Sequence, residues 1–162
     1  MHPAVHRFLA DCSRKIQPRN AVEIGSRNVN GSARDHFTCA WWGVDIEPGD
    51  GVDEVRDYST GCPLDMVERF DLAVSTETFE HSENWRGLFD FMVDAVKPGG
   101  HLIVTCATTG RAPHSAVDGG PVRAGEWYRN VEIDEMDHPR VRWLRSSVDL
   151  DNGDLCAFGV KW

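Results

Sequence analysis

Short apolar runs alternate with helix-forming segments along most of this chain, and few folds accommodate that order. The apolar runs predict five strands, at residues 21–24, 40–46, 52–56, 70–75 and 101–106. Apolar spacing and capping residues predict helices at residues 3–16, 32–38, 63–69 and about 85–97. Strands that alternate with helices favour an α/β fold whose sheet is mostly parallel and carries helices on both faces.

The last third of the chain follows a different pattern. Residues 107–130 show no periodicity and are rich in Gly, Pro and Ser, which predicts a long functional or mobile loop. Residues 131–138 favour a helical turn, and residues 141–149 and 155–161 predict an antiparallel hairpin closed by Asn152-Gly153. No repeat or linker interrupts the 162 residues, so we expect one domain, residues 1–162.

Charge and cysteine content exclude several classes of protein. The chain carries 17 Lys and Arg against 26 Asp and Glu, a net charge of −9, which argues against general nucleic-acid binding. No apolar run approaches the ~20 residues of a membrane span, and the N-terminus lacks a signal pattern. The five cysteines are odd in number and widely spaced, which indicates reduced thiols and a cytoplasmic protein.

Polar residues stand where the predicted strands end, and ligands of open α/β sheets bind beyond those ends. Gly25 would let a ligand approach the backbone, and helix amides beyond Gly31 would favour a carboxylate or phosphate. Each acid also has a structural interpretation. Glu23 is suited to bonding loop amides, Asp45 to starting a turn, and Asp57 is an ordinary loop acid.

The order of these features resembles the class I S-adenosylmethionine-dependent methyltransferases. The segments "FDLAVSTETFEH" (residues 70–81) and "AVKPGGHLIVTC" (residues 95–106) are similar to two motifs of that family, and the resemblance covers roughly residues 18–160. It implies a Rossmann-like, seven-stranded sheet with a reversed last strand. It also implies S-adenosylmethionine as cofactor and S-adenosylhomocysteine as product. The chain departs from the family in the longer loop between Gly25 and Gly31.

The same resemblance implies which residues meet the cofactor. Those by its methionine end are Glu23, Gly25, Ser26 and Gly31. Asp45 would bind the ribose hydroxyls, Ile46 would cover one adenine face, and Asp57 with Tyr58 would meet the adenine edge. Those bordering the methionine amine and the sulfonium are Ser75, Thr76 and Glu77.

For the methyl acceptor we expect an oxygen or nitrogen of a small polar molecule. His81 is the candidate general base, since it follows the fourth strand and histidine titrates near neutrality. The loop at residues 107–130 would form a lid with substrate-binding side chains Arg111, His114, Arg123, Trp127 and Tyr128. Its two arginines favour an acceptor with a carboxylate or phosphate.

Alternatives stay open beside this hypothesis. A nicotinamide-binding Rossmann domain is disfavoured because Gly-x-Gly-x-x-Gly is missing. A module that binds S-adenosylmethionine without catalysis remains, as does a methyltransferase acting on RNA, DNA or protein. The scattered histidines predict no metal site, and a homo-oligomer that completes the pocket is a further hypothesis about partners.

Overall fold

The computed structural model describes all residues, 1–162, and contains one sheet with two α-helices. The strands are β1 (Asn20–Ile24), β2 (Ala40–Asp45), β3 (Glu54–Val55), β4 (Phe70–Thr76), β5 (Val96–Ala107), β6 (Val141–Asp149) and β7 (Asp154–Lys161). The helices are α1 (Pro3–Ser13) and α2 (Trp85–Ala95), with short 3₁₀ turns η1 (Ala33–Asp35), η2 (Phe79–His81) and η3 (Ile133–Met136). Neither α-helix is long and apolar enough to cross a membrane.

The seven strands form one sheet in the order β3-β2-β1-β4-β5-β7-β6. β1 to β5 run parallel, β7 is antiparallel to β5, and β6 pairs antiparallel with β7. The mostly parallel sheet, its reversed strand and the C-terminal hairpin are therefore as predicted.

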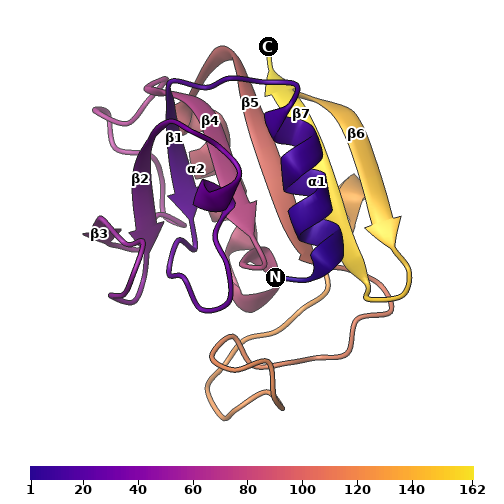
Figure 1. The fold of residues 1–162 in the computed structure, drawn as a ribbon. Helices are drawn as coiled ribbons and strands as arrows, with labels where there is room; N and C mark the ends of the chain where they lie inside the picture. Colours follow the sequence, from indigo (N-terminus) through magenta and orange to yellow (C-terminus); the bar gives the residue numbers. More distant parts are fainter.

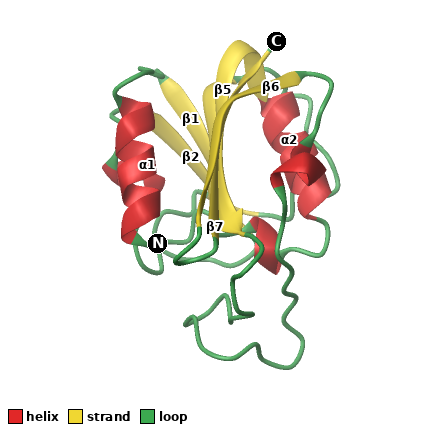
Figure 2. Ribbon diagram, turned by 90° about the vertical axis from the view of Figure 1, so that its right-hand side faces the viewer, coloured by secondary structure: helices red, strands yellow, loops and turns green.

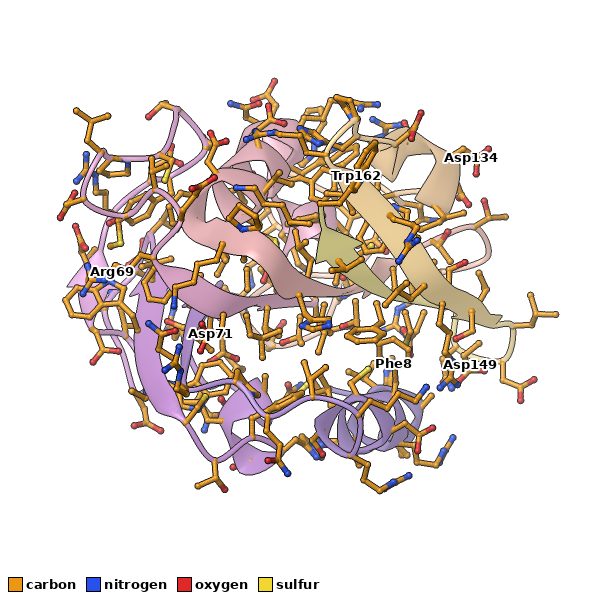
Figure 3. All side chains as sticks on the ribbon, turned by 90° about the horizontal axis from the view of Figure 1, so that it is seen from above. Phe8, Arg69, Asp71, Asp134, Asp149 and Trp162 are labelled. Carbon is orange, nitrogen blue, oxygen red and sulfur yellow. The ribbon has the colours of Figure 1, made fainter.

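The sheet is covered on both faces, with α1 on one and α2 on the other (Figure 2). Alternate residues of the central strands enter two separate cores. In β5, Leu102 and Val104 belong to the core on the α2 side, whereas Ile103 faces the α1 side. Figure 3 shows Phe8 of α1 between its helix and the sheet, in the smaller of the two cores. Burial on both faces explains the continuous apolar runs.

Two predicted helices are wrong. The segment predicted at 32–38 shortens to η1, and the one predicted at 63–69 forms turns only. In the second, the backbone N–H groups of Glu68 and Arg69 donate to the carbonyls of Asp94 and Ala95 at the end of α2. Those amides cannot also make helical bonds, and Glu68 has a positive φ of 51°. α2 ends at Ala95, earlier than the predicted end near Lys97, because the chain enters β5 at Val96.

The carboxyl ends of β1, β2 and β4 lie at the lower edge of the sheet in Figure 1. The loop at residues 107–130, drawn in orange, hangs from the same edge, and the N-terminus lies there too. β7 begins where β5 ends, since Asp154 pairs with Ala107. This topology brings distant segments together around one edge.

Candidate functional site

A cavity of about 930 Å³ opens at this edge of the sheet. It lies within the range of about 300–1,000 Å³ that is usual for small-molecule sites. Its walls include most of the residues predicted for the site, namely Glu23, Gly25, Ser26, Gly31, Asp45, Ile46, Asp57, Tyr58, Thr76, Glu77, His81, Arg111 and His114. Ser75, Arg123, Trp127 and Tyr128 are not among the lining residues.

The turn after β1 approaches the end of β4 closely. Gly25 has a φ of 71°, and a Cβ built there would lie 2.0 Å from Thr78 Oγ1. The N–H groups of Gly25 and Ser26 both donate to the Val44 carbonyl, at 3.0 and 3.1 Å. The Ser26 hydroxyl is buried and has no hydrogen-bond partner. Those two amides are therefore occupied, and the Ser26 hydroxyl lies 2.7 Å from the position of a Cβ built on Gly43 rather than on the open surface of the cavity.

The Glu23 carboxylate binds groups of the protein itself. It accepts hydrogen bonds from the Ala33 amide at 3.2 Å and the Ser32 hydroxyl at 3.3 Å, and it pairs with Arg34 at 3.3 Å. Burial raises the pKa of Glu23, and these donors oppose the shift. The expectation that helix amides beyond Gly31 bind a ligand is wrong, because η1 has three residues and its first N–H donates to Glu23.

Asp45 ends β2 and points both oxygens at neighbouring loops. Oδ2 accepts from the Arg27 amide at 3.1 Å and Oδ1 accepts from the Glu47 amide at 3.0 Å. Each carboxylate oxygen can accept a second hydrogen bond, so these contacts orient the carboxylate and leave it able to bind hydroxyls. Ile46 beside it is 68% exposed, which is unusual for a large apolar side chain and supplies a flat apolar wall.

Asp57 and Tyr58 differ in accessibility. Asp57 is exposed, and its Oδ1 accepts from the Ser59 amide at 2.8 Å. Tyr58 is only 2% exposed, and its ring stacks on Phe91 with centroids 4.3 Å apart. Its hydroxyl donates to Glu54 at 2.7 Å. The Tyr58 ring thus belongs to the core, although the residue itself borders the cavity beside Asp57.

The end of β4 presents Thr76 and Glu77, whereas Ser75 is fully buried inside the sheet. The prediction that Ser75 borders a ligand therefore does not fit. Glu77 has a positive φ of 54°, and non-glycine residues in that region are often found at functional sites. The Thr105 hydroxyl donates to Glu77 Oε1 at 2.9 Å. Burial and the nearby Asp154 raise the pKa of Glu77.

Three rings meet where η2 contacts the long loop. The ring centroids of His81 and His114 are 4.9 Å apart, and Tyr128 lies 5.5 Å from His81 and 4.9 Å from His114. Burial, followed by the proximity of His114, lowers the pKa of His81 to about 4. His81 is therefore neutral at pH 7 but weakly basic, which disfavours its predicted role as general base.

The remaining loop residues divide into two groups. Arg111 lines the cavity, donates to the Asn152 carbonyl at 2.9 Å and lies 3.6 Å from Asp154. Arg123 instead pairs with Asp118 at 2.5 Å, and Trp127 is 42% exposed. Arg123 and Trp127 therefore do not line this cavity, and Tyr128 packs against the two histidines that do.

Sequence patterns missed part of the cavity wall. Met1, His2 and Asn30 close one side, where the Met1 amine donates to the Asn30 carbonyl at 3.2 Å. His2 Nδ1 lies 2.7 Å from Asp154 Oδ2. The start of the chain carried no local motif that would place it beside β7, so only the fold could identify these residues.

Comparisons with known proteins agree with the topology. The NodS N-methyltransferase of Bradyrhizobium japonicum, crystallised with S-adenosylhomocysteine, matches with a TM-score of 0.65 and 18% identity over 98% of this chain and 86% of that one. The 1,6-didemethyltoxoflavin-N1-methyltransferase of Burkholderia thailandensis matches with a TM-score of 0.71 and 13% identity over 98% and 78% of the two chains. A search of curated protein sequences finds no match.

The sequence itself matches the family model described as a methyltransferase domain over residues 3–151. That span includes every element from α1 to β6. The chain therefore belongs to the methyltransferase-domain family, as its resemblance to the class I S-adenosylmethionine-dependent enzymes predicted.

Proposed function

We propose that this chain transfers the methyl group of S-adenosylmethionine to an oxygen or nitrogen of a small polar acceptor. The observation that carries the proposal is the convergence on one cavity of Gly25 and Ser26 after β1, Asp45 after β2 and Glu77 after β4. Family membership supports the reaction class, and S-adenosylhomocysteine bound to both structural neighbours supports the cofactor.

In the proposed complex the cofactor lies along the ends of β2, β1 and β4. Asp45 accepts the ribose hydroxyls, Ile46 covers the adenine, and Asp57 meets its edge. Gly25 and Ser26 border the methionine end. Thr76 and Glu77 border the sulfonium, whose positive charge is stabilised by a nearby carboxylate in a partly dry site.

The acceptor occupies the part of the cavity between His81 and the long loop. His114, Arg111 and the loop segment 115–119 line this end. The loop folds back on itself, since the Ser115 hydroxyl donates to Glu126 at 2.7 Å and the Ser115 amide donates to the Gly120 carbonyl at 2.7 Å. A folded loop over a cavity of about 930 Å³ favours a small acceptor over a macromolecule.

The main requirement of methyl transfer is the correct positioning of the two reactants. The acceptor atom attacks the methyl carbon in line with the sulfonium, the carbon–sulfur bond breaks with its electron pair on sulfur, and the acceptor's proton leaves to solvent. Holding the two reactants at the attack distance and excluding water accounts for most of such catalysis. His81 and His114 would contact the acceptor as neutral rings.

Turnover of a metabolite panel tests this proposal. The purified protein is incubated with S-adenosylmethionine and each small hydroxyl, amine or carboxylate compound, and S-adenosylhomocysteine is measured. The proposal expects formation of S-adenosylhomocysteine with at least one small compound. Turnover only with RNA, DNA or protein would overturn the small acceptor, and cofactor binding without any turnover would favour the non-catalytic module.

A further inference from the structure

Glu80 and His81 of η2 and His114 of the long loop bring one ligand atom each to within 4.8 Å of the others. The two histidines line the cavity, and Glu80 lies directly behind them, fully buried. Donor atoms around a tetrahedral Zn²⁺ are about 3.3–3.4 Å apart, given bond lengths of about 2.0–2.1 Å. Small side-chain rotations would therefore close this group around one ion.

Two buried polar atoms of this group have no hydrogen-bond partner. Glu80 Oε1 accepts from the Ala107 amide at 3.0 Å, but Oε2 is buried and has no hydrogen-bond partner. His81 Nδ1 is also buried without a partner. A buried polar atom left unpaired costs about 1–3 kcal/mol, so two of them in one cluster of potential ligands indicate a missing ligand.

His114 is oriented as a metal ligand. Its Nδ1 lies 3.2 Å from the Ala112 carbonyl, which can only accept, so this contact fixes the proton on Nδ1. Nε2 then carries the free lone pair. Ligating histidines usually donate their second ring N–H to a carbonyl or carboxylate in this way.

A second cluster of potential ligands, His2, Glu77 and Asp154, does not carry the same argument. Its histidine already pairs with Asp154 at 2.7 Å, and Arg111 lies 3.6 Å from the other oxygen of Asp154. Asp154 Oδ1 also lacks a hydrogen-bond partner, but Arg111 supplies its opposite charge. This ion-pair network engages Arg111, and no Lys, Arg or His forms an ion pair with Glu80.

We propose that Glu80, His81 and His114 bind one divalent transition-metal ion of the Zn²⁺ class at the acceptor end of the cavity. One carboxylate and two imidazoles suit such an ion, and three protein ligands leave a coordination position open toward the cavity. A hydroxyl or amine of the acceptor could bind there and lose its proton more readily. This role rests on the proposed function, whereas metal binding itself does not.

Calorimetric titration of ZnCl₂ into untagged protein stripped with EDTA tests the site. We expect one ion per chain. His114→Ala lies in a surface loop and should weaken binding by at least about 100-fold, since removing even an outer-shell partner costs about 10–100-fold. Glu80→Gln should weaken it similarly. His36→Ala is the control, because His36 and His6 form the other close histidine pair, at 3.0 Å.

Absorption of bound Co²⁺ gives an independent readout of tetrahedral coordination, expected in the wild type and lost in His114→Ala. No stoichiometric binding by the wild type, or equal binding by wild type and His114→Ala, would overturn the site. S-adenosylhomocysteine is titrated into the same preparations. If it binds and zinc does not, only the metal site fails; if zinc binds and it does not, only the proposed function fails.

Discussion

Replacing Gly25 by Ala should lower the free energy of unfolding by more than an equivalent substitution elsewhere in the chain. At a φ of 71° an alanine costs about 1–2 kcal/mol relative to glycine. The new Cβ would also lie 2.0 Å from Thr78 Oγ1 and 2.7 Å from its Cγ2, and such overpacking costs about 1–3 kcal/mol. The lower entropy of the unfolded alanine chain returns about 0.4–1 kcal/mol. We expect a net loss of about 1–4.5 kcal/mol.

Gly119 supplies a matched control. Its φ is also 71°, but nothing lies within 4 Å of the position where its Cβ would stand. Gly119→Ala should therefore cost only the backbone term, about 0–1.5 kcal/mol after the entropic offset. The difference between the two variants isolates the close approach of the β1 turn to Thr78.

Urea denaturation followed by circular dichroism measures both losses, and thermal unfolding should place Gly25→Ala about 2–18 °C below the wild type. Adding Thr78→Ala to Gly25→Ala should recover part of the loss, because it removes the two nearest atoms. Equal destabilisation by Gly25→Ala and Gly119→Ala, or no recovery in the double variant, would refute the steric argument.

Three further substitutions test the assignment of neighbouring residues. Glu23→Gln should lower the free energy of unfolding by about 1–3 kcal/mol in urea, since it removes the buried one of the two carboxylates that pair with Arg34, the other being Asp53 at 3.1 Å; an unchanged midpoint would contradict this. Gly87→Ala should destabilise the protein, because a Cβ on Gly87 of α2 would lie 1.8 Å from the Ser59 carbonyl oxygen. This clash should outweigh alanine's advantage of about 1 kcal/mol over glycine in a helix, and a raised melting temperature would refute the prediction. Tyr58→Phe should keep S-adenosylhomocysteine affinity within about twofold by calorimetry, since the ring lies in the core; a tenfold loss would restore Tyr58 to the adenine site.

The sheet was predictable because its strands are buried on both faces and read as continuous apolar runs. Leu102, Ile103 and Val104 need no alternation when helices cover both sides. Asn152-Gly153 correctly marked the terminal hairpin, although its loop spans residues 150–153 and only Gly153 of the two has a positive φ. The predicted 63–69 helix failed because its amides bond to the end of α2, a tertiary contact that local sequence cannot contain.

Site residues that lie at the ends of strands could be predicted from the sequence. Those whose place in the site depends on the direction of the side chain could not. Asp45 and Glu77 lie at the cavity because parallel strands end at one edge. Position alone did not show that Tyr58 points into the core. Nor could spacing join His81 with His114, which meet only because the loop after β5 folds back over η2.

Calorimetric titration of S-adenosylhomocysteine into the wild type, Asp45→Ala and Asp50→Ala tests the central claim, that the cavity binds the cofactor with Asp45 at its ribose. Two hydrogen bonds to a charged carboxylate contribute about 1.5–3 kcal/mol each, so Asp45→Ala should weaken binding at least about 100-fold. Asp50 lies on the neighbouring loop outside the cavity lining, and Asp50→Ala should bind like the wild type. Unchanged affinity in Asp45→Ala, or no binding by the wild type, would contradict the account.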